Sequence, residues 1–214
     1  VQKRERLILV GHRKDLVFGN SFFDCLAKYV EAAPTIKELF EDLPSIKSGG
    51  SSHKYRCDVS SQFVEKYIRK KDDILTQHAA RPHNENDLKI YKLVLKAKKK
   101  GKNLRYIDIP EELQTHSNTT SFLDRYKALD YGSVSHTVVA HIAKDGHYYI
   151  HPDLRQNRSI TVREAARIQG FPDDFYFEHS RTAAFKQIGN AVPPILSKKI
   201  AMAVIDFLRG EKGE

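Results

Sequence analysis

Hydrophobic residues recur every three to four positions in three stretches of the sequence, the spacing typical of helices with one buried face. The stretches are residues 63–68, 88–95 and 195–208. The second stretch runs into lysines 98–100 and Gly101, an ending that favours a solvated helix terminus over a DNA contact. Pro194 precedes the third stretch and Gly210 closes it, so both boundaries of that helix are predicted.

Two further helix starts are predicted at Thr35 and Thr161, because each threonine is followed three residues later by a glutamate. This spacing allows a reciprocal cap between the two side chains. The first helix should be short and end near Asp42. The second should reach Gln169 and stop at Gly170, which tolerates the left-handed backbone of a helix end.

Strands are predicted at two places. Residues 7–10 form a continuous apolar run before Gly11, which is typical of a strand buried in an α/β sheet. The residues that follow supply no obvious neighbouring strands, a hint that part of the sheet is missing. Residues 137–142 and 147–150 flank Asp145 and Gly146, which predicts a hairpin.

Composition limits the class of protein. The 214 residues are 40% hydrophobic and 29% charged, which indicates a folded globular chain. No apolar stretch approaches the roughly 18 residues of a membrane span, and no signal peptide is visible, so we expect an intracellular, cytoplasmic protein without a membrane partner. Thirty-six Lys and Arg against 27 Asp and Glu leave a net charge of +9, which favours a polyanionic partner but is shared by ribosomal and membrane-surface proteins.

Metal binding is not expected. The chain has two cysteines, too few for a disulfide scaffold or a cysteine-rich zinc module. A zinc site needs about four converging ligands, and alternation along strands would separate the histidines that cluster in the sequence. These candidates are His53 with Cys57, and His136, His141, His147 and His151.

Three blocks resemble the DNA cytosine-5 methyltransferase family and occur in the order of that family. They are Gln2-Lys3-Arg4-Glu5-Arg6 before the apolar run, Thr161-Val162-Arg163-Glu164-Ala165-Ala166-Arg167-Ile168-Gln169-Gly170-Phe171-Pro172, and Gln187-Ile188-Gly189-Asn190-Ala191-Val192-Pro193-Pro194. The first block is weak by itself, whereas the other two are long and specific. Residues 80–85 and 126–152 are also similar to the target-recognition domains of one bacterial subset. The resemblance covers nearly the whole chain, although residues 15–60 match least and Val1 stands where the family usually has Pro or Ala.

The resemblance implies a fold of α/β plus α+β class. Residues 1–20 and 179–214 would belong to an incomplete S-adenosylmethionine-dependent methyltransferase domain of Rossmann-like type. Residues 21–178 would form a smaller, mixed target-recognition domain. The surface left open by the missing sheet predicts poor solubility or tight association with a partner.

The resemblance also assigns chemical roles. Methylation of cytosine C5 requires a thiolate to add at C6, and negative charge then builds at N3 and O2 of the ring. Arg6 would donate to O2, while Arg4 and Gln2 would orient it; the alternative is that both arginines merely flank the solvated end of a strand. Asn190, Ala191 and Val192 would close one side of the S-adenosylmethionine pocket; the alternative is an ordinary helix start with proline in its first turn.

Contacts with duplex DNA follow from the same resemblance, because the target base must leave the helix to be methylated. Thr137 would lie near the flipped base. Lys144, Arg155 and Arg158 would contact phosphates or bases. Arg163 and Arg167, four residues apart on one helix face, would either contact DNA or brace the domain through ion pairs.

Three parts of the family are absent from the sequence: the Gly-rich cofactor loop, the Pro-Cys nucleophile and the Glu-Asn-Val acid. Neither Cys25 nor Cys57 has the Pro-Cys context. We therefore expect the DNA-recognising, C-terminal part of a DNA cytosine-5 methyltransferase of bacterial restriction-modification, acting at the nucleoid. It would be inactive without the N-terminal half, which would supply most of the cofactor pocket as a subunit or as preceding sequence.

Two alternatives remain open. A non-catalytic DNA-binding module is disfavoured by the retention of Arg6 and Asn190, which a pure binder does not need. A part of a transfer-RNA cytosine-5 methyltransferase is disfavoured by the length of the recognition region and its similarity to the duplex-reading bacterial subset.

Overall fold

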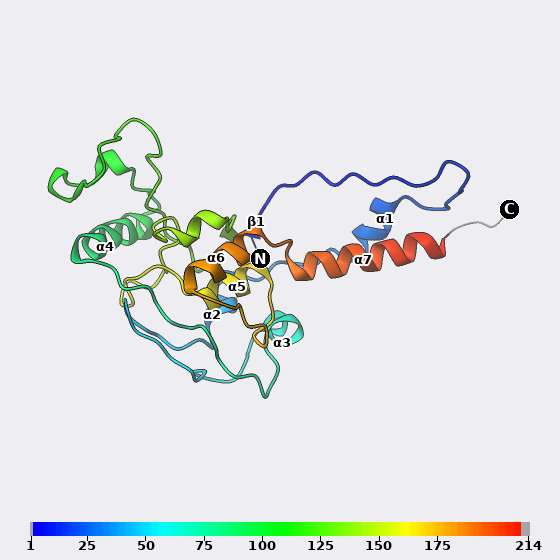
Figure 1. Ribbon diagram of the computed structural model, residues 1–214, viewed down its shortest axis with the longest axis horizontal. Helices are drawn as coiled ribbons and strands as arrows, with labels where there is room; N and C mark the ends of the chain where they lie inside the picture. Colours follow the sequence, from blue (N-terminus) through cyan, green and yellow to red (C-terminus); the bar gives the residue numbers. More distant parts are fainter. Residues whose placement is uncertain (1, 211–214) are drawn as a thin grey trace.

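The computed structural model describes residues 2–210, which are mainly helices joined by long irregular segments (Figure 1). The α-helices are α1 (Phe22–Ala27), α2 (Ile36–Phe40), α3 (Gln62–Tyr67), α4 (Glu85–Lys99), α5 (Val162–Gln169), α6 (Arg181–Asn190) and α7 (Pro194–Arg209). Three short 3-10 helices are η1 (Tyr106–Asp108), η2 (Glu111–Leu113) and η3 (Ala140–Ala143). Two short strands, β1 (Gln2–Lys3) and β2 (Ser135–His136), pair in parallel with Gln2 opposite Ser135.

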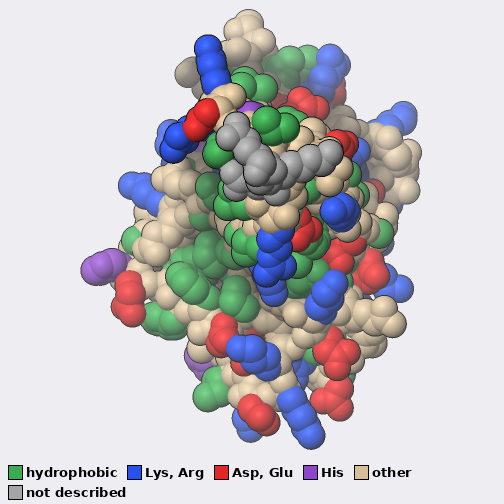
Figure 2. Space-filling view, turned by 90° about the vertical axis from the view of Figure 1, so that its right-hand side faces the viewer, with side chains coloured by type: hydrophobic (Ala, Val, Ile, Leu, Met, Phe, Trp, Pro, Cys, Tyr) green, Lys and Arg blue, Asp and Glu red, His purple; other side chains and the backbone are tan. Residues whose placement is uncertain are grey.

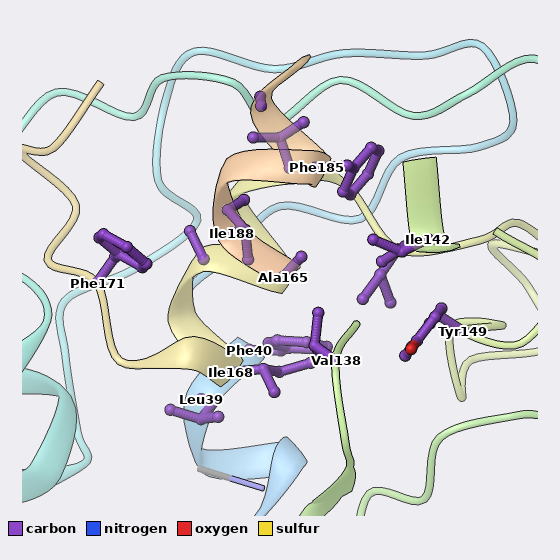
Figure 3. Close-up of a cluster of buried hydrophobic side chains, with 14 of the residues drawn as sticks. Leu39, Phe40, Val138, Ile142, Tyr149, Ala165, Ile168, Phe171, Phe185 and Ile188 are labelled. Atoms are coloured by element: carbon purple, nitrogen blue, oxygen red, sulfur yellow. The ribbon is translucent and has the colours of Figure 1, made fainter. Parts of the chain in front are cut away.

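The centre of the molecule is α5, all eight residues of which are buried. It packs against α2 on one side and α6 on the other, and α6 also contacts η3 (Figure 3). The core around it includes Leu39, Val138, Ile168, Phe185 and Ile188. Because these side chains come from segments up to about 150 positions apart, this core joins the first and last parts of the chain.

A second hydrophobic cluster supports the lobe that contains α4. Buried residues of α4, such as Tyr91 and Leu95, pack against Tyr106, Tyr126 and Ile150. Figure 1 shows this lobe, with the loop that follows α4, at the opposite end of the molecule from α7.

An arm formed by α1 and α7 projects from the body (Figure 1). The two helices bury only a small cluster, Phe22, Cys25, Ala203 and Phe207. Many other apolar side chains of the arm and of the N-terminal segment are exposed, and Figure 2 shows hydrophobic side chains gathered on this face of the molecule. The exposed ones include Leu7, Leu9, Val10, Val192, Leu196, Met202, Val204, Ile205 and Leu208, which we call the open apolar face.

The helix predictions are confirmed by α2, α3, α4, α5 and α7. Both threonine caps form, and Gly170 ends α5 with a φ of 83°. The sequence reasoning missed α1, which the Ser21 cap starts, and α6, which ends with the first four residues of the third block. No helix of residues 2–210 is long and apolar enough to cross a membrane.

Both strand predictions are wrong. Residues 7–10 are not paired as a strand, and the side chains of Leu7 and Leu9 are each 85% exposed, because the described residues place no sheet beside them. The expected hairpin is also absent from the described residues, although Gly146 does make a turn with a φ of 80°. Val138 and Ile142 are buried, and between them the chain enters η3 instead of continuing as a strand.

Candidate functional site

The first strand holds the segment after β2 against the end of α6. The backbone N–H of Val138 donates to Gln2 Oε1 at 2.6 Å, and Arg4 Nη1 donates to the Val138 carbonyl at 3.0 Å. Arg4 Nη1 also donates to the Gly189 carbonyl at 3.4 Å, and Gln2 Nε2 donates to Gln169 Oε1. Gln2 and Arg4 of the first block therefore contact the second and third blocks, at residues 167 and 185 positions further along the chain.

The end of α6 approaches η3 closely. A Cβ atom on residue 189 would overlap the backbone at Val139–Ala140, so glycine is the one residue type that fits at this position. Gln169 Nε2 donates to the carbonyls of Ile188 at 2.7 Å and Ala191 at 3.1 Å, which secures the turn into α7. The third block thus lies at the end of α6 and in the short turn into α7.

Arg6 lies beside a cleft of 580 Å³ between the N-terminal segment and the junction of α6 and α7. Asn190, Ala191 and Val192 line the same cleft. Arg6 is exposed, and its Nη1 donates to the Glu5 carbonyl at 2.6 Å. The structure therefore brings together the residues that the family resemblance assigns to the base and to the cofactor, while their roles remain predictions.

A second cavity, of 480 Å³, lies on the other side of β1, because successive side chains of an extended strand alternate. Lys3, Lys98, Lys127, Thr137 and Tyr148 are among its lining residues, and we call it the lysine pocket. Thr137 Oγ1 donates to the Lys3 carbonyl, and Lys127 Nζ lies 4.9 Å from the centre of the Tyr148 ring. Three lysines thus line a cavity next to the residue expected near the flipped base, and Lys98 Nζ lies 3.9 Å from the carboxylate of Asp130, which lines the same cavity.

Sequence reasoning missed the lysine pocket. It assigned Lys98 to a solvated helix end and gave Lys3 and Lys127 no role. The local pattern holds no signal for this pocket, because its three lysines come from β1, the end of α4 and the segment before β2. Their convergence follows only from the tertiary fold.

Three of the arginines expected to contact DNA are instead buried, which corrects that expectation. The side chains of Arg158, Arg163 and Arg167 are all 0% exposed. Arg158 forms two hydrogen bonds of 2.7 Å with the Glu164 carboxylate. Arg163 donates to the carbonyls of Pro172 and Phe175 and to Thr76. A buried guanidinium is costly unless its N–H groups are hydrogen-bonded. The hydrogen bonds of Arg158 and Arg163 meet this need and connect α5 to the segments around it.

Arg167 pairs with two carboxylates, whereas Arg158 and Arg163 each pair with one. Its Nη2 donates to Asp42 at 3.0 Å, its Nε donates to Asp173 at 3.0 Å, and its Nη1 donates to the Leu39 carbonyl at 2.7 Å. Arg163 and Arg167 therefore lie in buried ion pairs, as the alternative that they brace the domain had it. By contrast, Lys144 and Arg155 are exposed, so DNA contact by these two remains a prediction.

Two buried histidines make the fold sensitive to acid. Burial lowers the pKa of His136 to about 4 and that of His151 to about 3. The unfolded chain, with histidine pKa near 6.5, binds more protons below that pH, so stability is complete above about pH 6.5 and falls as the pH drops toward 4. We expect the free energy of unfolding to be lower at pH 5.0 than at pH 7.5, by on the order of 1–2 kcal/mol for each histidine. The urea midpoint should fall accordingly. Equal midpoints at the two pH values would contradict this.

One group of side chains has a composition suited to a metal ion, although none was expected. His83, Asp87 and His147 each offer a ligand atom within 4.8 Å of the others. Of these three residues, the sequence analysis considered His147 alone as a possible metal ligand. It considered it together with His136, His141 and His151, which are not part of this group. The spacing of His83 and Asp87, four residues apart at a helix start, was an available signal.

Comparisons with known proteins agree with the resemblance. The family described as C-5 cytosine-specific DNA methylase matches residues 1–206. The chain is 43% identical over 216 residues to the type II methyltransferase M.Bpa9945I of Bacillus paralicheniformis, covering 98% of this chain and 48% of that protein. It is 29% identical to M.Eco47II of Escherichia coli, covering 97% of this chain and 43% of that protein.

A solved structure is also similar. A DNA modification methyltransferase encoded within an E. coli prophage superposes with a TM-score of 0.52 and 26% identity, covering 83% of this chain and 48% of that one. The chain therefore spans just under half the length of each of these relatives.

Proposed function

The chain belongs to the C-5 cytosine-specific DNA methylase family, and from this premise we propose that it is the DNA-recognising, C-terminal part of a type II methyltransferase. Together with an N-terminal half, it would methylate C5 of a flipped-out cytosine in a specific duplex sequence, in restriction-modification. Alone, it would transfer no methyl group. The observation that carries the proposal is the shared cleft of Arg6 and Asn190, open beside the apolar face.

The open apolar face supports docking of an N-terminal half. Leu7 and Leu9 are 85% exposed, and α7 leaves Ile205 and Leu208 about half exposed. A surface of this kind is costly in water and usually marks an interface. Since the relatives are about twice as long as this chain, the part that covers this face would be the half with the nucleophile.

The cleft beside Arg6 fits a role at the reacting base. In such an arrangement Arg6 would donate to cytosine O2, where negative charge builds after the thiolate adds at C6, while Gln2 and Arg4 hold the strand in register. An exposed guanidinium at the cleft is suited to this task, because among the described residues it donates to the Glu5 carbonyl and its other N–H groups can reach a base.

The residues present also fit one wall of a cofactor site. The 190–192 segment combines an exposed amide side chain at Asn190 with apolar surface at Val192, and Leu196 continues that surface into α7. S-adenosylmethionine supplies the methyl group when bound. In this proposal the 190–192 segment covers one side of it, and the N-terminal half provides the rest.

DNA contacts would come from Thr137, Lys144, Arg155 and the lysine pocket. Three lysines at one cavity are suited to contact DNA phosphates. Neutralising these phosphates releases the counterions bound to the DNA, which favours binding. The lysine pocket lies on the opposite side of β1 from Arg6. A flipped nucleotide could therefore place its base toward Arg6 while a neighbouring phosphate lies near Lys3.

Removing two charges from the lysine pocket should weaken DNA binding. We expect Lys98→Gln with Lys127→Gln to lower duplex affinity about tenfold at 0.1 M salt and to reduce the salt dependence by up to two phosphate contacts. Fluorescence anisotropy over a salt series measures both effects. The matched control is Lys92→Gln with Lys96→Gln, which removes two exposed charges of the same helix outside the pocket. Equal losses in the two double variants would rule out a specific role for the pocket.

Reconstitution tests the proposed function. The chain would be co-expressed with the N-terminal half of the Bacillus relative, and tritiated methyl transfer measured on unmethylated plasmid DNA and on transfer RNA. We expect transfer to duplex DNA only when both halves are present. Turnover by the chain alone would refute the proposal. DNA binding without transfer by the pair would favour a non-catalytic module, and transfer to RNA alone would favour the tRNA enzyme.

A further inference from the structure

A partly buried polar cluster lies in the lobe of α4, apart from the cleft and the lysine pocket. His83 immediately precedes the helix cap, Asp87 is in the first turn of α4, and His147 follows the turn at Gly146. Their side chains are 2%, 16% and 13% exposed. Three potential ligands from two distant segments thus meet in a space with little access to water.

The distances in this cluster are too long for hydrogen bonds and suitable for a bridging cation. His83 Nδ1 lies 3.8 Å from one oxygen of Asp87, and His147 Nε2 lies 3.8 Å from the other. Two metal bonds of about 2.0–2.1 Å, meeting at a wide angle, span such a gap. Among the residues that the structure describes, none donates a hydrogen bond to the Asp87 carboxylate, which is an unusual state for a largely buried charge.

The far side of each imidazole ring is held by a hydroxyl group. His83 Nε2 is 2.9 Å from Ser159 Oγ, and His147 Nδ1 is 2.7 Å from the Tyr91 hydroxyl. Metal-binding histidines commonly use the second ring nitrogen to fix the orientation of the ring. With the ion bound, His83 Nε2 would carry the ring proton and donate to Ser159 Oγ, in place of the 3.4 Å hydrogen bond that it accepts here from the Ser159 backbone N–H.

We propose that His83, Asp87 and His147 bind one divalent transition-metal ion of the Zn²⁺ type. Two imidazole nitrogens and one carboxylate oxygen suit Zn²⁺, Co²⁺ or Ni²⁺ and do not suit Mg²⁺ or Ca²⁺, which prefer oxygen ligands alone. A water molecule completes the coordination. The ion connects the start of α4 to the segment after Gly146 and stabilises the lobe that contains α4. This site does not depend on the proposed function.

The test uses the tag-free 214-residue chain, dialysed against EDTA and then titrated with Co²⁺. We expect one equivalent to bind, with visible absorption bands of low-coordinate cobalt that Zn²⁺ then abolishes by displacement. His147→Ala and Asp87→Asn should each lower the affinity at least tenfold. Asp87→Asn is nearly isosteric, so it keeps the packing while weakening the ligand. His53→Ala, which changes an exposed histidine outside the cluster, should bind as the wild type does.

The melting temperature gives an independent measurement. Saturating Zn²⁺ should raise it for the wild-type chain and for His53→Ala, because an ion that binds only the folded state stabilises that state. The same Zn²⁺ concentration should raise the melting temperature of Asp87→Asn by less. Absence of saturable Co²⁺ binding by folded wild-type chain would overturn the proposal. Wild-type affinity in both His147→Ala and Asp87→Asn would overturn it as well.

Discussion

Replacement of Arg167 by methionine is expected to lower the free energy of unfolding by about 3–5 kcal/mol. The guanidinium group lies between the carboxylates of Asp42 and Asp173, and all three side chains are almost fully buried. Methionine fills much of the same volume but leaves two buried carboxylates with less compensation. The loss would be a large part of the 5–15 kcal/mol that typical domains have. Urea denaturation followed by circular dichroism measures it.

The matched control is Arg155→Met, which removes an arginine whose side chain is 90% exposed and paired with Asp153 on the surface. Water and salt screen such a pair, so its replacement should change the urea midpoint little. If Arg167→Met were as stable as Arg155→Met, the buried network would not be the stabilising element that its geometry indicates.

Replacement of Arg6 by alanine is expected to lower the methyl-transfer rate of the reconstituted enzyme by about 10²–10³-fold. The reason is that, under the proposed function, Arg6 stabilises charge that develops on the cytosine ring only as the reaction proceeds. DNA affinity should change much less than the rate, since the duplex is bound mainly elsewhere. Single-turnover kinetics with saturating DNA separate the two effects.

Arg105→Ala is a suitable control, because Arg105 is also an exposed arginine but pairs with Asp108 in the lobe after α4, outside the cleft. It should leave the single-turnover rate near that of the wild type. A rate for Arg6→Ala within a factor of two or three of the wild type would mean that this guanidinium does not act on the reacting base.

Helix boundaries were predictable because their signals are local. A threonine and a glutamate three residues apart determine where α5 starts, and Gly170 determines where it ends, whatever packs around it. The same holds for α7 between Pro194 and Gly210. Strands were not predictable in this way, since residues 7–10 have the composition of a buried strand but no partner strand beside them among the described residues.

Burial of charged residues was equally invisible in the sequence. Arg155, Arg158 and Arg167 look alike as letters, yet the first is 90% exposed and the other two are 0% exposed. What separates them is whether a carboxylate from another segment, such as Asp42, reaches the guanidinium inside the protein. A spacing of four residues identifies a common helix face but not what covers it.

By itself the sequence determined the family, most helix boundaries and the identity of the motif residues, because each depends on neighbours within about ten positions. Only the tertiary structure decided that Arg6 and Asn190 share a cleft, that three lysines surround one cavity, and that His83, Asp87 and His147 meet. These encounters join segments tens to nearly two hundred residues apart. They are produced by packing around α5, where the hydrophobic effect selects partners by shape and burial and not by order in the chain.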